Sequence, residues 1–150
     1  MKKKLAVLLA NLLICTIVFS QPLIDVTEQT IKLGALKTAE LFFSFAAGDQ
    51  ILFNFTEADK KEVHEVAIIE YPANTKFSES KVDRIKNKTL TVSKTAIYQF
   101  RFYNSAITDR VCKIRLQRIP ATEATQQYNT RVIWTAKHDT TWNAHTKKVI

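Results

Sequence analysis

The side chains that could carry out chemistry are scattered along this chain. Two histidines are followed by a carboxylate, in His64-Glu65 and His138-Asp139, and a third histidine is His145. Histidine and carboxylate can ligate zinc, but this spacing matches no zinc motif. The chain also lacks the patterns Gly-x-Ser-x-Gly and His-Glu-x-x-His and any phosphate-binding loop, and it holds 2 glycines in 150 residues. We therefore predict no metal, no cofactor and no enzymatic activity. A small secreted hydrolase is the least favoured alternative.

Cys112 is the one cysteine outside the first twenty residues. A lone cysteine cannot form an internal disulfide. Cys112, Ile114 and Leu116 alternate with charged and polar residues, which places the thiol on the apolar side of a strand. We predict that Cys112 is a small buried apolar side chain. A reactive thiol or an intermolecular disulfide is the alternative.

The candidate binding residues are cationic. Arg101, Lys113 and Arg115 alternate with apolar residues. This pattern predicts that they project from one sheet face, joined by Tyr103 and Arg131. Such a patch suits the carboxylate, sulfate or phosphate groups of a glycan or lipid. The alternative is a solvated face, or a set of edge charges that prevents unwanted strand pairing.

The first twenty residues have the three-part layout of a secretory signal. Three lysines follow the initial methionine, and the stretch from Leu5 to Phe19 is largely apolar. Its 15 residues fall short of the about 20 that cross a bilayer. The short side chains of Val18 and Ser20 suit a signal peptidase, so we predict cleavage between Ser20 and Gln21. An uncleaved membrane anchor is the alternative, and it is the one membrane attachment that we expect.

Residues 21–150 are expected to form one exported domain with an ordered core over about 29–135 and a loosely packed C-terminal tail. Hydrophobic residues make up 46% of the sequence and charged residues 24%, which favours a packed core over disorder. Without the signal the chain keeps 19 basic and 14 acidic residues. This mildly basic balance permits contact with anionic surfaces. We expect no nucleic-acid partner, because the domain works in the periplasm or outside the cell.

Alternating and β-branched residues predict an all-β fold of seven or eight antiparallel strands, packed as a two-sheet sandwich or jelly roll. The expected strands are 30–33, 40–45, 50–55, 63–71, 89–92, 96–103, 112–117 and 131–135. Residues 40–45 and 50–55 are expected to form a hairpin through a turn at Gly48. Tyr98, Phe100 and Phe102 must face the core, because a one-residue slip would bury Arg101. A turn or two of helix is expected near 57–63 or 121–128.

Two segments resemble known families. The run Ala-Ile-Tyr-Gln-Phe-Arg-Phe-Tyr-Asn-Ser over 96–105 resembles the penultimate strands of lumenal GOLD (Golgi-dynamics) domains. The run Ala-Gly-Asp-Gln-Ile over 47–51, followed by Phe53, resembles the opening of bacterial pre-peptidase C-terminal domains. The first resemblance implies a β-sandwich that binds other proteins, and the second implies a secreted jelly roll attached to other modules. The transmembrane helix and coiled coil of the Golgi proteins are missing from this sequence, so a small exported bacterial protein is the better analogue.

These observations lead to one functional prediction. We expect an exported, non-enzymatic domain that recognises a protein or an anionic carbohydrate. The cationic face and the loop 104–109 are the first places to look for its site. The alternative is a structural accessory module of a larger envelope or secreted assembly.

Overall fold

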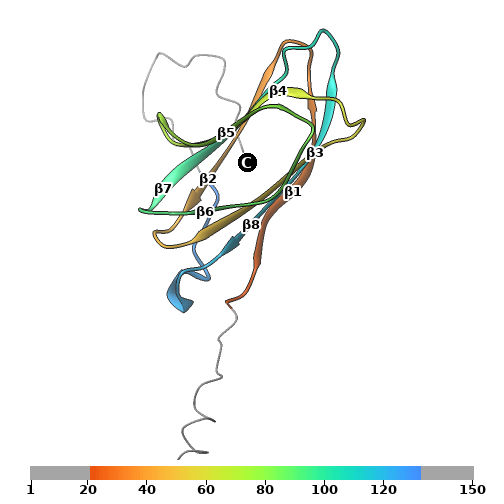
Figure 1. Cartoon of the computed structure of the whole chain (residues 1–150). Coiled ribbons are helices and arrows are strands. Elements are labelled where there is room, and N and C mark those ends of the chain that lie inside the picture. The colour runs from red at the N-terminus through yellow and green to blue at the C-terminus, as the bar shows by residue number, and fades with distance from the viewer. Residues whose placement is uncertain (1–20, 133–150) are drawn as a thin grey trace, which may run out of the picture.

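The computed structural model describes residues 21–132 (Figure 1). The expected signal, most of the predicted strand 131–135, and His138 and His145 lie outside the described residues. The described elements, in chain order, are β1 (Ile24–Leu33), β2 (Thr38–Phe45), β3 (Gln50–Glu57), β4 (Val63–Glu70), β5 (Asn74–Val82), β6 (Arg84–Thr91), β7 (Ala96–Tyr103), β8 (Arg110–Ile119) and the 3₁₀ helix η2 (Glu123–Thr125).

The eight strands form two four-stranded sheets that pack face to face (Figure 1). We call the sheet of order β1-β8-β3-β6 sheet A, and the sheet of order β2-β7-β4-β5 sheet B. All neighbouring strands are antiparallel. Two such sheets with crossing connections make an eight-stranded jelly roll. The predicted fold class is therefore confirmed. Within the described range, no helix is long and apolar enough to span a membrane.

Aromatic rings from both sheets fill the space between them. The Phe53 ring of sheet A lies 5.5 Å from the Phe100 ring of sheet B and 6.3 Å from the Phe102 ring, centre to centre. Phe55 stacks on Phe102 at 5.7 Å, and Tyr98 is buried beside them. The inward alternation of β7 is confirmed, because its alternate residues carry the aromatic core of sheet B.

The predicted hairpin of residues 40–45 and 50–55 is wrong. β2 pairs with β7, while β3 pairs with β6 and β8, so the turn carries the chain from sheet B to sheet A. Phe45 of β2 and Phe53 of β3 are both buried in the core, which they reach from opposite layers. Alternation shows that two strands cover one core, but it does not show whether they lie beside or across from each other.

Other parts of the strand prediction also differ from the structure. β1 and β6 are longer than the predicted short strands, because they begin at Ile24 and Arg84. β5 was not predicted, because this edge strand is exposed on both faces except at Phe77 and Val82 and lacks an apolar alternation. Of the predicted strand 131–135, Arg131 forms a single bridge with Phe43.

The turn between β2 and β3 depends on Gly48. Its φ is +85°, in the left-handed region that favours glycine, and its N–H donates to the Val92 carbonyl over 2.7 Å. A Cβ at this position would lie 2.8 Å from the Cβ of Ala121, closer than van der Waals contact allows.

We expect Gly48→Ala to lower the free energy of unfolding by about 1–2 kcal/mol from the left-handed backbone alone, and by more from the collision. Urea unfolding measures this loss. Gly34→Ala is the matched control, because the nearest atom to its added Cβ would be the flexible Lys37 side chain at 3.2 Å. Equal losses in the two variants would contradict the role given to Gly48.

A buried ion pair anchors the segment that follows β8. The Arg118 guanidinium lies 3.1 Å from the Asp49 carboxylate, and both side chains are buried. Arg118 also donates to the main-chain carbonyls of Thr125, Gln126 and Tyr128. These hydrogen bonds hold the main chain of residues 125–128 next to sheet A, before the chain reaches β2 at Arg131.

Candidate binding surface

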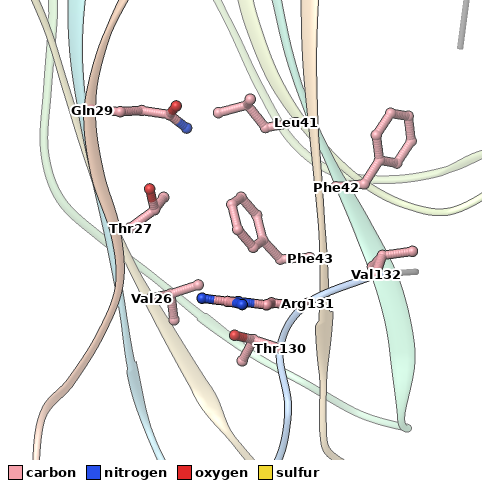
Figure 2. A pocket seen from close by; sticks show the side chains of 9 residues that line it. All are labelled: Val26, Thr27, Gln29, Leu41, Phe42, Phe43, Thr130, Arg131 and Val132. Atoms are coloured by element: carbon pink, nitrogen blue, oxygen red, sulfur yellow. The ribbon is translucent and has the colours of Figure 1, made fainter. Parts of the chain in front are cut away.

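The five predicted binding residues do not share one face. Arg101 and Tyr103 lie on the outer face of sheet B, and Lys113 and Arg115 lie on the outer face of sheet A. Arg131 lies at the sandwich edge between β1 and β2 (Figure 2). The prediction of a single basic face is wrong, because β7 and β8 follow each other in the sequence but belong to opposite sheets. Alternation separates inward from outward residues and does not identify the sheet.

Arg101 has acidic neighbours on sheet B. Its guanidinium lies 3.1 Å from the Glu65 carboxylate, and Glu40 is its cross-strand partner on β2. Tyr103 contacts the His64 ring edge to face at 5.1 Å. The positive charge of Arg101 is therefore balanced by acids of its own sheet.

Lys113 and Arg115 are paired with acids of β1. The Lys113 ammonium lies 2.7 Å from Glu28, and Arg115 lies 3.2 Å from Asp25. The hydrogen bond and charge of Lys113 hold the pKa of Glu28 below its usual value. Exposed pairs of this kind contribute little to stability, because water and salt screen them. Both cations stay exposed to solvent beside their carboxylates.

The strand register extends this cationic surface across sheet A. Thr56 of β3 is paired with Lys113 of β8 on one side and with Arg84 of β6 on the other. The three residues therefore form one cross-strand row on the outer face, and the main chains of its two ends lie about 10 Å apart. Arg84 is exposed, and within residues 21–132 it has no ion pair. We call Lys113, Thr56 and Arg84 the cationic row.

Sequence reasoning missed Arg84 because β6 was predicted too short. A signal was present, since β6 and β8 each carry at least three cations and no acid. Beside the row, Asn54 accepts a hydrogen bond of 2.8 Å from the Asn87 N–H. This contact lies at a bulge in the β3–β6 ladder that also leaves Lys86 exposed. Polar side chains thus surround the cations in the middle of the face.

A cleft lies between the edge strands β1 and β2 (Figure 2). Figure 2 shows Phe43 and Leu41 pointing from β2 toward β1, and Arg131 reaching toward Val26. Its volume is about 250 Å³, which is below the about 300–1,000 Å³ of typical small-molecule sites. The cleft is therefore a weaker candidate for a ligand site than the outer face of sheet A.

The residues with catalytic potential are dispersed. Cys112 is buried, as predicted, and burial raises the pKa of its thiol to about 12, so the thiolate form is disfavoured at neutral pH. Among residues 21–132, no three His, Cys, Asp or Glu side chains gather into a set of metal ligands. The loop 104–109 is organised by buried Asn104, whose amide donates to the carbonyls of Gly34 and Thr108.

The strand order defines the class of the protein, an eight-stranded jelly-roll β-sandwich with a cationic row on one outer face. No protein-family model matches the chain, and no curated protein matches it.

Proposed function

We propose that this chain is an exported, non-enzymatic jelly-roll domain that binds an anionic carbohydrate on the outer face of sheet A. The cationic row is the observation that carries this proposal. In the strand ladders Thr56 lies between Arg84 and Lys113, and the Lys113 ammonium is bonded to Glu28 of β1. Cations donate charge-assisted hydrogen bonds to sulfate or carboxylate, and a hydroxyl can bond a sugar hydroxyl.

The surroundings of the row support a sugar as the ligand. Asn54 carries an amide on the same outer face, opposite Arg115 in the β3–β8 ladder. A sugar chain presents hydroxyl groups as well as charges, so it can use amides and cations together. The signal expected in the first twenty residues supports a place outside the cytoplasm, where glycans are abundant and nucleic acids are not.

The two family resemblances support a role as a non-catalytic module. The residues that carry the first resemblance include Tyr98, Phe100, Phe102 and Asn104, all of which are buried. They support the sandwich fold, but buried residues do not indicate the ligand, which must be inferred from the residues on the surface. In this proposal, the resemblance to pre-peptidase C-terminal domains is the closer of the two, because those domains are secreted jelly rolls.

Binding of dextran sulfate to residues 21–150, with neutral dextran as the reference, tests the proposal. We expect Arg84→Gln and Lys113→Gln each to weaken binding by about 10- to 100-fold, because each removes charge-assisted hydrogen bonds of about 1.5–3 kcal/mol. Binding should also weaken as salt is raised.

Arg101→Gln is the matched control, because it removes one positive charge from the outer face of the opposite sheet. We expect this variant to keep nearly all of the binding. Equal loss in all three variants would show that net charge alone attracts the polymer, and it would overturn the proposed site. Equal binding of neutral dextran would overturn the proposed ligand class.

A further inference from the structure

Two bulky aliphatic side chains are exposed to solvent on neighbouring loops. Leu36, in the loop between β1 and β2, is 61% exposed, and Ile107, in loop 104–109, is 85% exposed. The Leu36 N–H donates to the Ala106 carbonyl over 3.0 Å, which joins the two loops. Figure 1 shows both loops at the upper end of the sandwich, in orange and blue-green. We call Leu36 and Ile107 the apolar tip.

The main chain around Leu36 is fixed in an uncommon conformation. Leu36 has a φ of +56°, in the left-handed region that bulky side chains rarely adopt. On one side of it, the Ala35 N–H donates to the Asp109 carboxylate over 2.9 Å. On the other side, the Lys37 carbonyl accepts from the Asn104 N–H over 3.0 Å. Strained backbone of this kind is found most often at functional sites, so we interpret the exposure of Leu36 as functional.

Cations outnumber acids around the apolar tip. The Arg110 guanidinium donates to the Glu62 carbonyl over 3.4 Å, which connects loop 58–62 to the start of β8. Lys37 follows the tip leucine, is exposed, and has no ion pair within residues 21–132. Asp109 is neutralised by Lys32 of β1 at 2.8 Å. The other charged residues of these loops are Asp59, Lys60 and Lys61.

Apolar side chains next to cations suit the surface of an anionic lipid bilayer. Aliphatic side chains are buried at the boundary of the acyl chains, and nearby lysines and arginines are attracted to the lipid phosphates. Burial of the apolar tip there would remove apolar surface from water. A groove on another protein could also cover the tip, but an apolar groove would give no acidic partner to Lys37 or Arg110. The charges therefore favour the bilayer.

We propose that the apolar tip, with Lys37 and Arg110 beside it, docks the folded domain onto the surface of an anionic lipid bilayer. Leu36 and Ile107 enter the interface, and the two cations contact the phosphates. The sequence led us to expect membrane attachment through the first twenty residues alone, whereas this contact is made by the domain itself. The inference is independent of the proposed carbohydrate ligand.

Sedimentation of residues 21–150 with phosphatidylglycerol–phosphatidylcholine vesicles tests the inference, with vesicles of phosphatidylcholine alone as the reference. We expect binding to the anionic vesicles that weakens as salt is raised. Ile107→Ser should weaken this binding about tenfold, because it removes the burial of an aliphatic side chain. Lys37→Gln should weaken it about fivefold. Equal binding to the neutral vesicles, or no binding to either kind, would overturn the proposal.

Leu36→Asn separates docking from folding. Asparagine tolerates the left-handed backbone better than leucine does, so this variant should fold at least as well as the wild type and still lose vesicle binding. Leu23→Asn is the matched control, because Leu23 is 50% exposed and lies at the other end of β1. Its vesicle binding should stay unchanged. Wild-type binding by folded Leu36→Asn and Ile107→Ser would contradict docking through the tip.

The same variants distinguish this inference from the carbohydrate proposal. Ile107→Ser should bind dextran sulfate as the wild type does, because the tip is not part of the cationic row. If Arg84→Gln removes vesicle binding while Ile107→Ser keeps it, the lipids bind the cationic row and the inference is wrong. Self-association that Ile107→Ser abolishes, in a protein that binds no vesicles, would assign the tip to a protein contact and would also overturn it.

Discussion

Asp49→Ala is expected to lower the free energy of unfolding by about 3–5 kcal/mol, because it leaves the charge of Arg118 buried without its partner. The Asp49 carboxylate accepts from the Arg118 guanidinium over 3.1 Å and from the Ala121 N–H over 3.0 Å. It also accepts from the Ala46 N–H over 3.3 Å. The variant therefore loosens the β2–β3 turn and the segment after β8 together. Urea unfolding followed by circular dichroism measures the loss.

Asp25→Ala is the matched control, because Asp25 also pairs with an arginine, Arg115, but both side chains are exposed. Its expected cost is below about 1 kcal/mol. The double variant Asp49→Ala with Arg118→Met should cost less than the sum of its single variants, since neither charge is then left alone. Similar costs for Asp49→Ala and Asp25→Ala would contradict the anchoring role of the buried pair.

Phe53→Ala is expected to cost about 3–5 kcal/mol of unfolding free energy. Phe53 is fully buried, and its ring meets Phe100 and Phe102 of the opposite sheet. The variant removes a ring that joins the two layers and leaves a cavity that the close-packed core cannot fill. Thermal and urea unfolding should both report the loss.

Leu52→Ala provides the comparison for Phe53→Ala, because Leu52 is the next residue of β3 and faces outward, half-buried. Its expected cost is about 1 kcal/mol or less. A larger loss for Leu52→Ala than for Phe53→Ala would mean that β3 is turned the other way round. That result would also remove Thr56 from the outer face, and with it the cationic row.

The inward and outward faces of the strands could be predicted because burying an unpaired charged side chain costs free energy. Arg101 in β7 and Lys113 in β8 each indicate the register of their strand, since the other register would bury them. The inward charge of β8, Arg118, is paired with buried Asp49. β5 could not be predicted, because an exposed edge strand is held by main-chain hydrogen bonds that do not depend on its side chains. It pairs with β4, the strand before it in the chain, but it does not share the apolar pattern of β4.

The candidate site was harder to predict than the fold, because it depends on which strands are neighbours. Lys113 and Arg84 are 29 positions apart in the sequence, yet both are paired with Thr56. Alternation provides no such pairing, so Arg101 was grouped with Lys113 although the two lie on opposite outer faces. The long-range register is set by the packing of the whole sandwich, and it became visible only in the structure.

Chemical-shift mapping by NMR, with a sulfated oligosaccharide titrated into residues 21–150, tests the binding face most directly. The amide signals of Thr56, Arg84 and Lys113 should move together and saturate, while those of Arg101 and Tyr103 stay in place. Shifts confined to the β1–β2 cleft, at Val26 and Phe43, or to the outer face of sheet B would contradict the assignment of the ligand to sheet A.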